Sequence, residues 1–318
     1  MRRIAVMLTL PLLAAAGLAG CGGSSPASSA SAVVSVSGAF GKVPAVKIPA
    51  KKASGQLAVK TLVHGSGPSL TSNEAFVGNF ALYVWNGTSH RLLNSTFPKN
   101  TPILFSGQLL PGMEKALTGE KVGSRVLAVI PPKDAFGASG NPQAGIKGTD
   151  TLVFVVDLIK AFAGSEAASG QPVSHGGNGL PKVSAPAASA PAITMPSSQP
   201  PSRLVTKTLI KGTGPVIAKG QTVVVQYVGA IWKTGKVFDS SWKRHQPFGF
   251  TIGATPGQVI PGWDQGLVGQ PVGSRVLLSV PPADGYGKTG NTQAGIKGTD
   301  TLVFVVDILG TFGGTPAA

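Results

Sequence analysis

The sequence predicts an α+β protein made of two similar domains, each an antiparallel β-sheet with one short helix laid across it. Three observations lead to this prediction: β-branched runs bounded by Gly, Pro and Asp, a segment with helical spacing that begins with proline, and a long internal repeat. At 318 residues the chain is long enough for two ordinary domains.

The strand and helix patterns are clearest in the second half. Strands are expected at Thr222–Val228, Arg275–Val280 and Thr301–Ile308. Between the first two, Pro261 suits the first turn of a helix, because its missing N–H is not needed there. Trp263 and Leu267 are four residues apart, so they share one face of that helix.

The two halves are copies of one domain. The fifteen residues Gln143–Asp157 recur identically as Gln293–Asp307, an offset of 150. Nearer the domain starts, Lys60-Thr-Leu matches Lys207-Thr-Leu at an offset of 147, so a few residues of length change lie between. A period this long indicates a duplicated domain and not a solenoid, whose repeats run about 20–50 residues.

Two stretches without a sustained hydrophobic period flank these domains. Residues 21–54, rich in Ser, Ala, Gly and Val, are interpreted as a flexible tether. Residues 164–202 contain seven prolines and are interpreted as an extended linker, because proline at this density disfavours regular helix and sheet. We therefore expect domains over residues 55–163 and 203–313.

Residues 1–20 have the layout of a signal peptide. Arg2 and Arg3 precede an apolar run, Ile4–Leu18, that is too short for a stable membrane span. The small residues before Cys21 resemble the bacterial lipobox, at which the cysteine is diacylated and becomes the mature N-terminus. The alternative is an ordinary signal peptide and an incidental cysteine. We expect lipidation at Cys21, which anchors the protein at the extracytoplasmic face of the cell membrane.

Charge and composition exclude several function classes. The 27 Lys and Arg residues outnumber 12 Asp and Glu, for a net charge of +15. They form no run interleaved with aromatic residues, so we expect no nucleic-acid partner and favour a background attraction to anionic lipid or cell wall. One cysteine excludes a disulfide framework. The four histidines are far apart, and no Gly-x-Ser-x-Gly elbow is present, so we expect no metal, no cofactor and no hydrolase site.

Six short fragments of the second domain follow a recognisable order. They are Tyr227, Phe238-Asp-Ser-Ser241, Pro247-Phe-Gly-Phe250, Val259-Ile-Pro-Gly-Trp263, Tyr286-Gly287 and Phe304. Each fragment alone is a weak signal, but their order and spacing resemble the FKBP-type peptidyl-prolyl cis–trans isomerases over about 110 residues. The resemblance implies two FKBP-like domains, each a curved antiparallel sheet wrapped on a short helix.

The resemblance also implies a role for each matching residue. Trp263 is the floor on which a proline ring lies, and the surrounding aromatic walls are Tyr227, Phe238, Phe248 and Phe304. Asp239 is a buried carboxylate with Arg244 as its partner, and Tyr286 is a hydroxyl donor. Val259 and Ile260 form the lip of the site, and Ile296 makes an apolar contact from the loop. The loop Lys288–Gly298 departs from the family pattern, since it lacks the usual proline pair.

An aromatic site of this kind suits the chemistry. Rotation about an X–Pro bond has a barrier of ~18–20 kcal/mol, and lowering it requires no nucleophile, metal or proton relay. A site that binds the twisted amide better than the planar one suffices. The resemblance implies proline-containing polypeptides as substrates and macrolides such as rapamycin as further ligands. With the signal-peptide layout, the expected substrates are segments of secreted or cell-envelope proteins. A non-catalytic peptide-binding chaperone and a surface scaffold are the alternatives.

The first domain keeps the apolar character of this site and loses its polar groups. Aligned on the second domain, its replacements are Phe80 for Tyr227, Leu93 for Phe238, Asn94 for Asp239, Ile103 for Phe248, Met113 for Trp263 and Phe136 for Tyr286. Phe154 and the Leu109-Leu110 lip are retained. We therefore expect the first domain to be a degenerate copy, with activity confined to the second.

Overall fold

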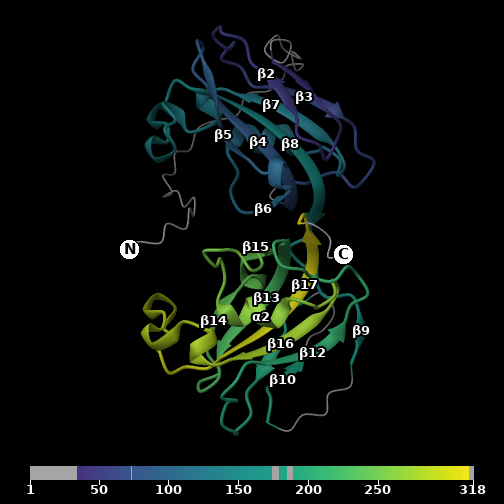
Figure 1. Cartoon of the computed structure of the whole chain (residues 1–318), viewed down its shortest axis with the longest axis vertical. Coiled ribbons are helices and arrows are strands. Elements are labelled where there is room, and N and C mark those ends of the chain that lie inside the picture. Colours follow the sequence, from purple (N-terminus) through teal and green to yellow (C-terminus); the bar gives the residue numbers. More distant parts are fainter. Residues whose placement is uncertain (1–33, 73, 174–178, 185–188, 315–318) are drawn as a thin grey trace, which may run out of the picture.

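The structure is a computed structural model that describes residues 34–72, 74–173, 179–184 and 189–314 (Figure 1). The expected signal peptide and the expected lipidation site Cys21 lie outside these residues. No helix within the described ranges is both long enough and apolar enough to cross a membrane.

The first domain is an antiparallel sheet that packs one face against a short helix. Its strands, in chain order, are β3 (Ala58–Val63), β4 (Ala75–Trp85), β5 (His90–Ser95), β6 (Ile103–Phe105), β7 (Arg125–Ile130) and β8 (Thr151–Phe162). Their order across the sheet is β3-β7-β8-β4-β5, and β6 also pairs with β4. Helix α1 (Pro111–Leu117) places Met113, Ala116 and Leu117 in the core on one face of this sheet.

The second domain repeats this arrangement. Its strands are β12 (Val205–Lys211), β13 (Thr222–Ile231), β14 (Val237–Ser240), β15 (Phe248–Thr251), β16 (Arg275–Val280) and β17 (Leu302–Phe312), joined by the short β9 (Gln171–Pro172). The order is β14-β13-β17-β16-β12-β9, and β15 also pairs with β13. Helix α2 (Pro261–Leu267) begins at proline and buries Trp263 and Leu267, as predicted. The α+β prediction is confirmed.

Short 3-10 helices shape the loops that flank each helix and sheet. In the first domain they are η1 (Phe97–Lys99), η2 (Pro132–Asp134), η3 (Gly137–Ser139) and η4 (Pro142–Ala144). In the second domain they are η5 (Trp242–Arg244), η6 (Pro282–Asp284), η7 (Gly287–Thr289) and η8 (Thr292–Ala294).

Each sheet is covered on its outer face by a small hairpin. Strands β1 (Ser35–Ser37) and β2 (Ala45–Lys47) pair before the first sheet, and β10 (Lys182–Ser184) and β11 (Ala192–Thr194) pair before the second. The interpretation of 21–54 and 164–202 as stretches without regular structure is therefore wrong for these segments. Val36 and Val46 stand at the same offset of 147 from Val183 and Ile193, so the hairpin belongs to the duplicated unit.

The physical reason for the hairpins lies in the sheets. All six residues of β7 and of β16 are buried, so these strands have apolar side chains on both faces. The helix covers only one face, and the hairpin covers the other with Val34 and Ile48, which pack on Trp85, Leu127 and Val129. A strand that is apolar on both faces is the signal that could have predicted a second covering layer.

An ion pair is buried at the equivalent position of each sheet. The Arg125 guanidinium donates from Nε to Asp157 Oδ1 over 2.6 Å, and both side chains are fully buried. The hairpin loop satisfies the remaining groups, because Arg125 also donates to the carbonyls of Gly38 and Lys42, and Gly41 N donates to Asp157. In the second domain Arg275 and Asp307 form the same pair. These additional hydrogen bonds help to offset the cost of desolvating the buried pair.

Replacing Trp85 with Ala tests the outer layer. Trp85 is 1% exposed and lies in the cluster between hairpin and sheet, so its removal leaves a large cavity. We expect the free energy of unfolding of the first domain to fall by about 3–5 kcal/mol. Urea denaturation followed by circular dichroism measures the change. Val43→Ala is the control: Val43 is 59% exposed in the same hairpin, and equal losses in the two variants would contradict the packing role of the layer.

Candidate active site

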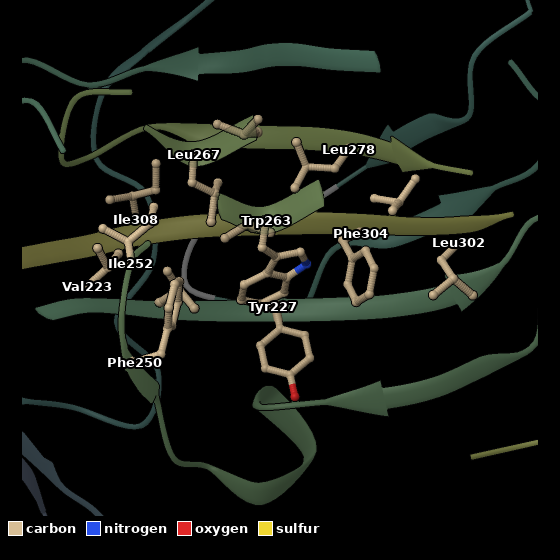
Figure 2. Packing of buried hydrophobic residues seen from close by; sticks show 14 of the residues in the cluster. Val223, Tyr227, Phe250, Ile252, Trp263, Leu267, Leu278, Leu302, Phe304 and Ile308 are labelled. Atoms are coloured by element: carbon tan, nitrogen blue, oxygen red, sulfur yellow. The ribbon is translucent and has the colours of Figure 1, made fainter. Parts of the chain in front are cut away.

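Trp263 belongs to a core cluster that includes four of the aromatic side chains predicted for the site: Tyr227, Phe238, Phe248 and Phe304. Figure 2 shows Tyr227 and Phe304 beside Trp263. The Trp263 ring makes edge contacts with Tyr227 at a centroid distance of 5.2 Å and with Phe304 at 5.3 Å. Tyr227 comes from β13, Phe304 from β17 and Trp263 from the third position of α2. The helix therefore brings its indole onto the two neighbouring strands at the centre of the sheet.

The other predicted walls complete this ring cluster. Phe248 lies 5.9 Å from Tyr227 and 6.2 Å from Trp263, and Phe238 makes an edge contact with Phe304 at 5.6 Å. Val259 and Ile260, immediately before α2, pack against the same cluster. We call Tyr227, Phe238, Phe248, Trp263 and Phe304 the aromatic site. Such edge-on arrangements are favoured by the quadrupoles of the rings.

A polar network lies at one margin of the aromatic site. The Tyr227 hydroxyl donates to Asp239 Oδ2, and Arg244 Nη1 donates to Asp239 Oδ1. Arg244 Nη2 also donates to the Tyr227 hydroxyl oxygen over 3.1 Å. The structure thus brings together three predicted site residues, Tyr227, Asp239 and Arg244, in charge-assisted hydrogen bonds.

The environment keeps the Tyr227 phenol protonated. Burial raises its pKa well above the ordinary value, and the hydrogen bond and negative charge of Asp239 raise it further, against a smaller opposing effect of Arg244. The phenol is therefore a hydrogen-bond donor over the whole physiological pH range.

The expectation that Asp239 is buried is wrong. Its side chain is 39% exposed, and that of Arg244 is 47% exposed. Asp239 stands near the end of β14, an edge strand that pairs only with β13 among the described strands, so water reaches one side of it. The carboxylate is held by its two partners and not by exclusion from solvent.

The two predicted site residues of the long loop after η6 differ in their exposure to solvent. Ile296 is 3% exposed and belongs to the core cluster that contains the aromatic site. Tyr286 is 38% exposed, and burial raises its pKa while a hydrogen bond with Asn291 lowers it. The charge of Asp239 raises it further.

Sequence reasoning missed Gly229, which the aromatic site requires. A Cβ at this position would lie 2.8 Å from Phe238 Cζ and 2.9 Å from Phe304 Cε1. The two rings therefore lie directly over the glycine. A lone glycine in a β-branched strand is the signal for such a close approach.

The same reasoning missed the support behind Tyr227. Ser241 accepts a hydrogen bond from Tyr227 N over 2.8 Å and donates to Gln226 Oε1, and both polar side chains are fully buried. Phe250 was also left without a role, and it packs 5.5 Å from Trp263 as part of the core.

The strand register confirms the replacements expected in the first domain. Phe80 faces Val156 as Tyr227 faces Val306, and Asn94 faces Leu82 as Asp239 faces Gly229. Leu82 thus stands where the second domain has glycine, and its side chain packs into the first core. The first domain has lost the phenol, the carboxylate and the indole, and a leucine takes the position over which Phe238 lies in the second.

No group of three or more His, Cys, Asp or Glu side chains that could hold a metal ion occurs in the part of the chain that the structure describes. The aromatic site offers apolar surface and the Tyr227 phenol, and the polar network at its margin adds one carboxylate–guanidinium pair.

Comparison with known proteins identifies the family. An "FK506-binding protein" of Streptomyces anulatus is 46% identical over 110 residues, which are 35% of this chain and 87% of that protein. "FK506-binding protein 2B" of Rhizopus delemar is 50% identical over 28% of this chain and 42% of that protein. Human "Peptidyl-prolyl cis-trans isomerase FKBP9" is 28% identical over 73% of this chain and 35% of that protein.

The family model described as FKBP-type peptidyl-prolyl cis-trans isomerase matches residues 78–159 and 214–309, one match in each domain and together more than half of the chain. The chain belongs to the FKBP-type peptidyl-prolyl cis–trans isomerases and contains two FKBP domains.

Proposed function

We propose that the isomerase activity of this chain belongs to the second domain. The observation that carries the proposal is the contrast between equivalent positions of the two domains. Tyr227, Asp239 and Trp263 form one connected site in the second domain. The first domain has Phe80, Asn94 and Met113 at these places.

In the proposed mechanism a proline ring of the substrate lies against Trp263 between the aromatic walls. The apolar surroundings strip water from the amide, and the planar amide, with its separated charges, loses more by this than the twisted one. The site accelerates rotation only to the extent that it binds the twisted amide more tightly. The pair of Asp239 and Arg244 holds the phenol of Tyr227 in one orientation.

The proposed substrates are proline-containing segments of secreted or cell-envelope proteins. The support for this location is the N-terminal sequence: a short basic start, an apolar run and a lipobox-like end at Cys21. The proposed location is the extracytoplasmic face of the cell membrane, with the lipid on Cys21 as the anchor. Macrolides such as rapamycin are proposed as further ligands of the aromatic site.

Paired substitutions in the full chain test the assignment to the second domain. We expect Trp263→Ala and Asp239→Ala to lower kcat/KM for a proline peptide by about tenfold or more, a loss of at least about 1.4 kcal/mol in transition-state binding. The matched changes Met113→Ala and Asn94→Ala leave it within about twofold. A protease-coupled isomerisation assay measures the rates. Equal losses from both pairs would assign activity to both domains.

Gly229→Leu tests the space required by the aromatic site. The leucine gives the second domain the side chain that Leu82 supplies in the first, and it displaces the Phe238 ring. We expect at least about tenfold loss of kcat/KM because substrate and wall are misplaced. Val216→Leu is the control, since Val216 is 57% exposed in the same domain. Full activity of Gly229→Leu would remove the steric explanation.

The anchor is tested separately. Mass spectrometry of the mature protein from its natural membrane should find an N-terminus at Cys21 that carries lipid, and Cys21→Ala should release the protein from the membrane fraction. An unmodified N-terminus at another residue would refute lipid anchoring and leave the isomerase assignment unaffected.

A further inference from the structure

The two domains pack through equivalent surfaces. Val77 and Val224, which differ by the repeat offset of 147, lie in one buried cluster. Phe162 and Phe312, which differ by 150, meet edge to face at 6.0 Å. When a residue contacts its own equivalent, the interface has the character of a twofold dimer interface. The first domain therefore sits on the second as one subunit sits on another.

Leu104 and Gly249 are the pair at which this equivalence is broken. Leu104 faces Val77 in the register of β6, and Gly249 faces Val224 in that of β15, so the two positions correspond. A Cβ on Gly249 would lie 2.5 Å from Leu104 Cβ and 3.1 Å from its Cδ2. The leucine of one domain thus occupies the space of the side chain that the other lacks. In Figure 1 β6 and β15 adjoin where the domains meet.

This contact lies behind a wall of the aromatic site. Gly249 stands between Phe248 and Phe250 on β15. Because successive residues of a strand point to opposite faces, Leu104 presses on the back of the strand whose front carries Phe248. Among the described strands β15 pairs with β13 alone, so its second support comes from the first domain.

A second contact reaches the other side of the site. Gly164, two residues after β8, accepts a hydrogen bond from Gln226 Nε2 over 2.8 Å. Gln226 in turn holds Ser241, which supports the backbone of Tyr227. Gly164 is also packed against the backbone of His245, since a Cβ there would lie 2.3 Å from that carbonyl oxygen. The end of the first domain is thereby joined to the segment that bears Arg244.

We propose that the first domain positions the aromatic site of the second, with Leu104 as a positioning residue that holds β15 and Phe248 in place. The inference rests on the proposed assignment of activity to the second domain. This role does not require the first domain to have a pocket of its own. The fold of the first domain supplies a rigid surface behind β15, the strand that carries Phe248.

The test uses the full chain with the leucine moved across the interface. We expect Leu104→Gly to lower kcat/KM about tenfold, because the wall is no longer held, and Gly249→Leu to lower it similarly by steric conflict. The double variant, Leu104→Gly with Gly249→Leu, restores one leucine to the shared space. We expect it to recover to within about threefold of the unchanged protein, which is a coupling that independent sites do not show. Leu104→Ile retains activity.

A spectroscopic readout separates positioning from stability. Fluorine NMR of 4-fluorophenylalanine placed at position 248 should give one narrow resonance in the unchanged chain and in the double variant. Each single variant should shift or broaden it, at temperatures below the unfolding transition of that variant. Leu92→Gly, at a 50% exposed position of the first domain, is the control and should leave resonance and activity unchanged.

The outcomes are distinguishable. If the unchanged chain is active and Leu104→Gly keeps its rate and its fluorine spectrum, the positioning role is overturned. If the double variant is no better than the single variants, the pairing across the interface is overturned. If the unchanged chain has no isomerase activity, the proposed function fails, and the fluorine spectra still decide whether Leu104 orders the Phe248 wall.

Discussion

Each sheet of this protein is apolar on both of its faces, and the rest of the structure follows from the need to cover both. The helices α1 and α2 cover the inner faces and bring Met113 and Trp263 with them. The hairpins cover the outer faces, and the loop of the first hairpin also supplies the carbonyls that surround the buried pair of Arg125 and Asp157. Since burial of apolar area is the main favourable contribution to folding, both layers contribute to the stability of each domain.

The sequence was sufficient for the duplication of the two sheets and for the helix, which depends on neighbouring residues. Pro261 marks the start of α2, and the spacing of Trp263 and Leu267 gives its buried face. The hairpins were not predicted because each of their strands is only three residues long, which is too short for a hydrophobic period to be recognised. Their order depends on packing against strands that are far away in the chain. Tertiary context overrides local pattern in such segments.

The residues of the site could be predicted from their types and order. The steric need for Gly229 and the solvent exposure of Asp239 could not. The need for Gly229 arises from rings on β14 and β17 that close over it, which only the assembled sheet defines. The exposure of Asp239 follows from its place on an edge strand, and strand order is not written in a single sequence. The first domain keeps the fold with Phe80 and Met113 in its core. Phe80 lacks the hydroxyl through which Tyr227 is bonded to Asp239 and Arg244 in the second domain.

The central strand of each sheet is the last one along its part of the chain. Strand β8 lies between β7 and β4, and β17 lies between β16 and β13. Long loops close before such a strand gains its partners, which makes folding slow relative to proteins with local contacts. During synthesis the second domain therefore has no complete sheet until its final residues have emerged, and until then its β-branched strands stand with open edges. A prolyl isomerase of this topology is therefore itself expected to fold slowly.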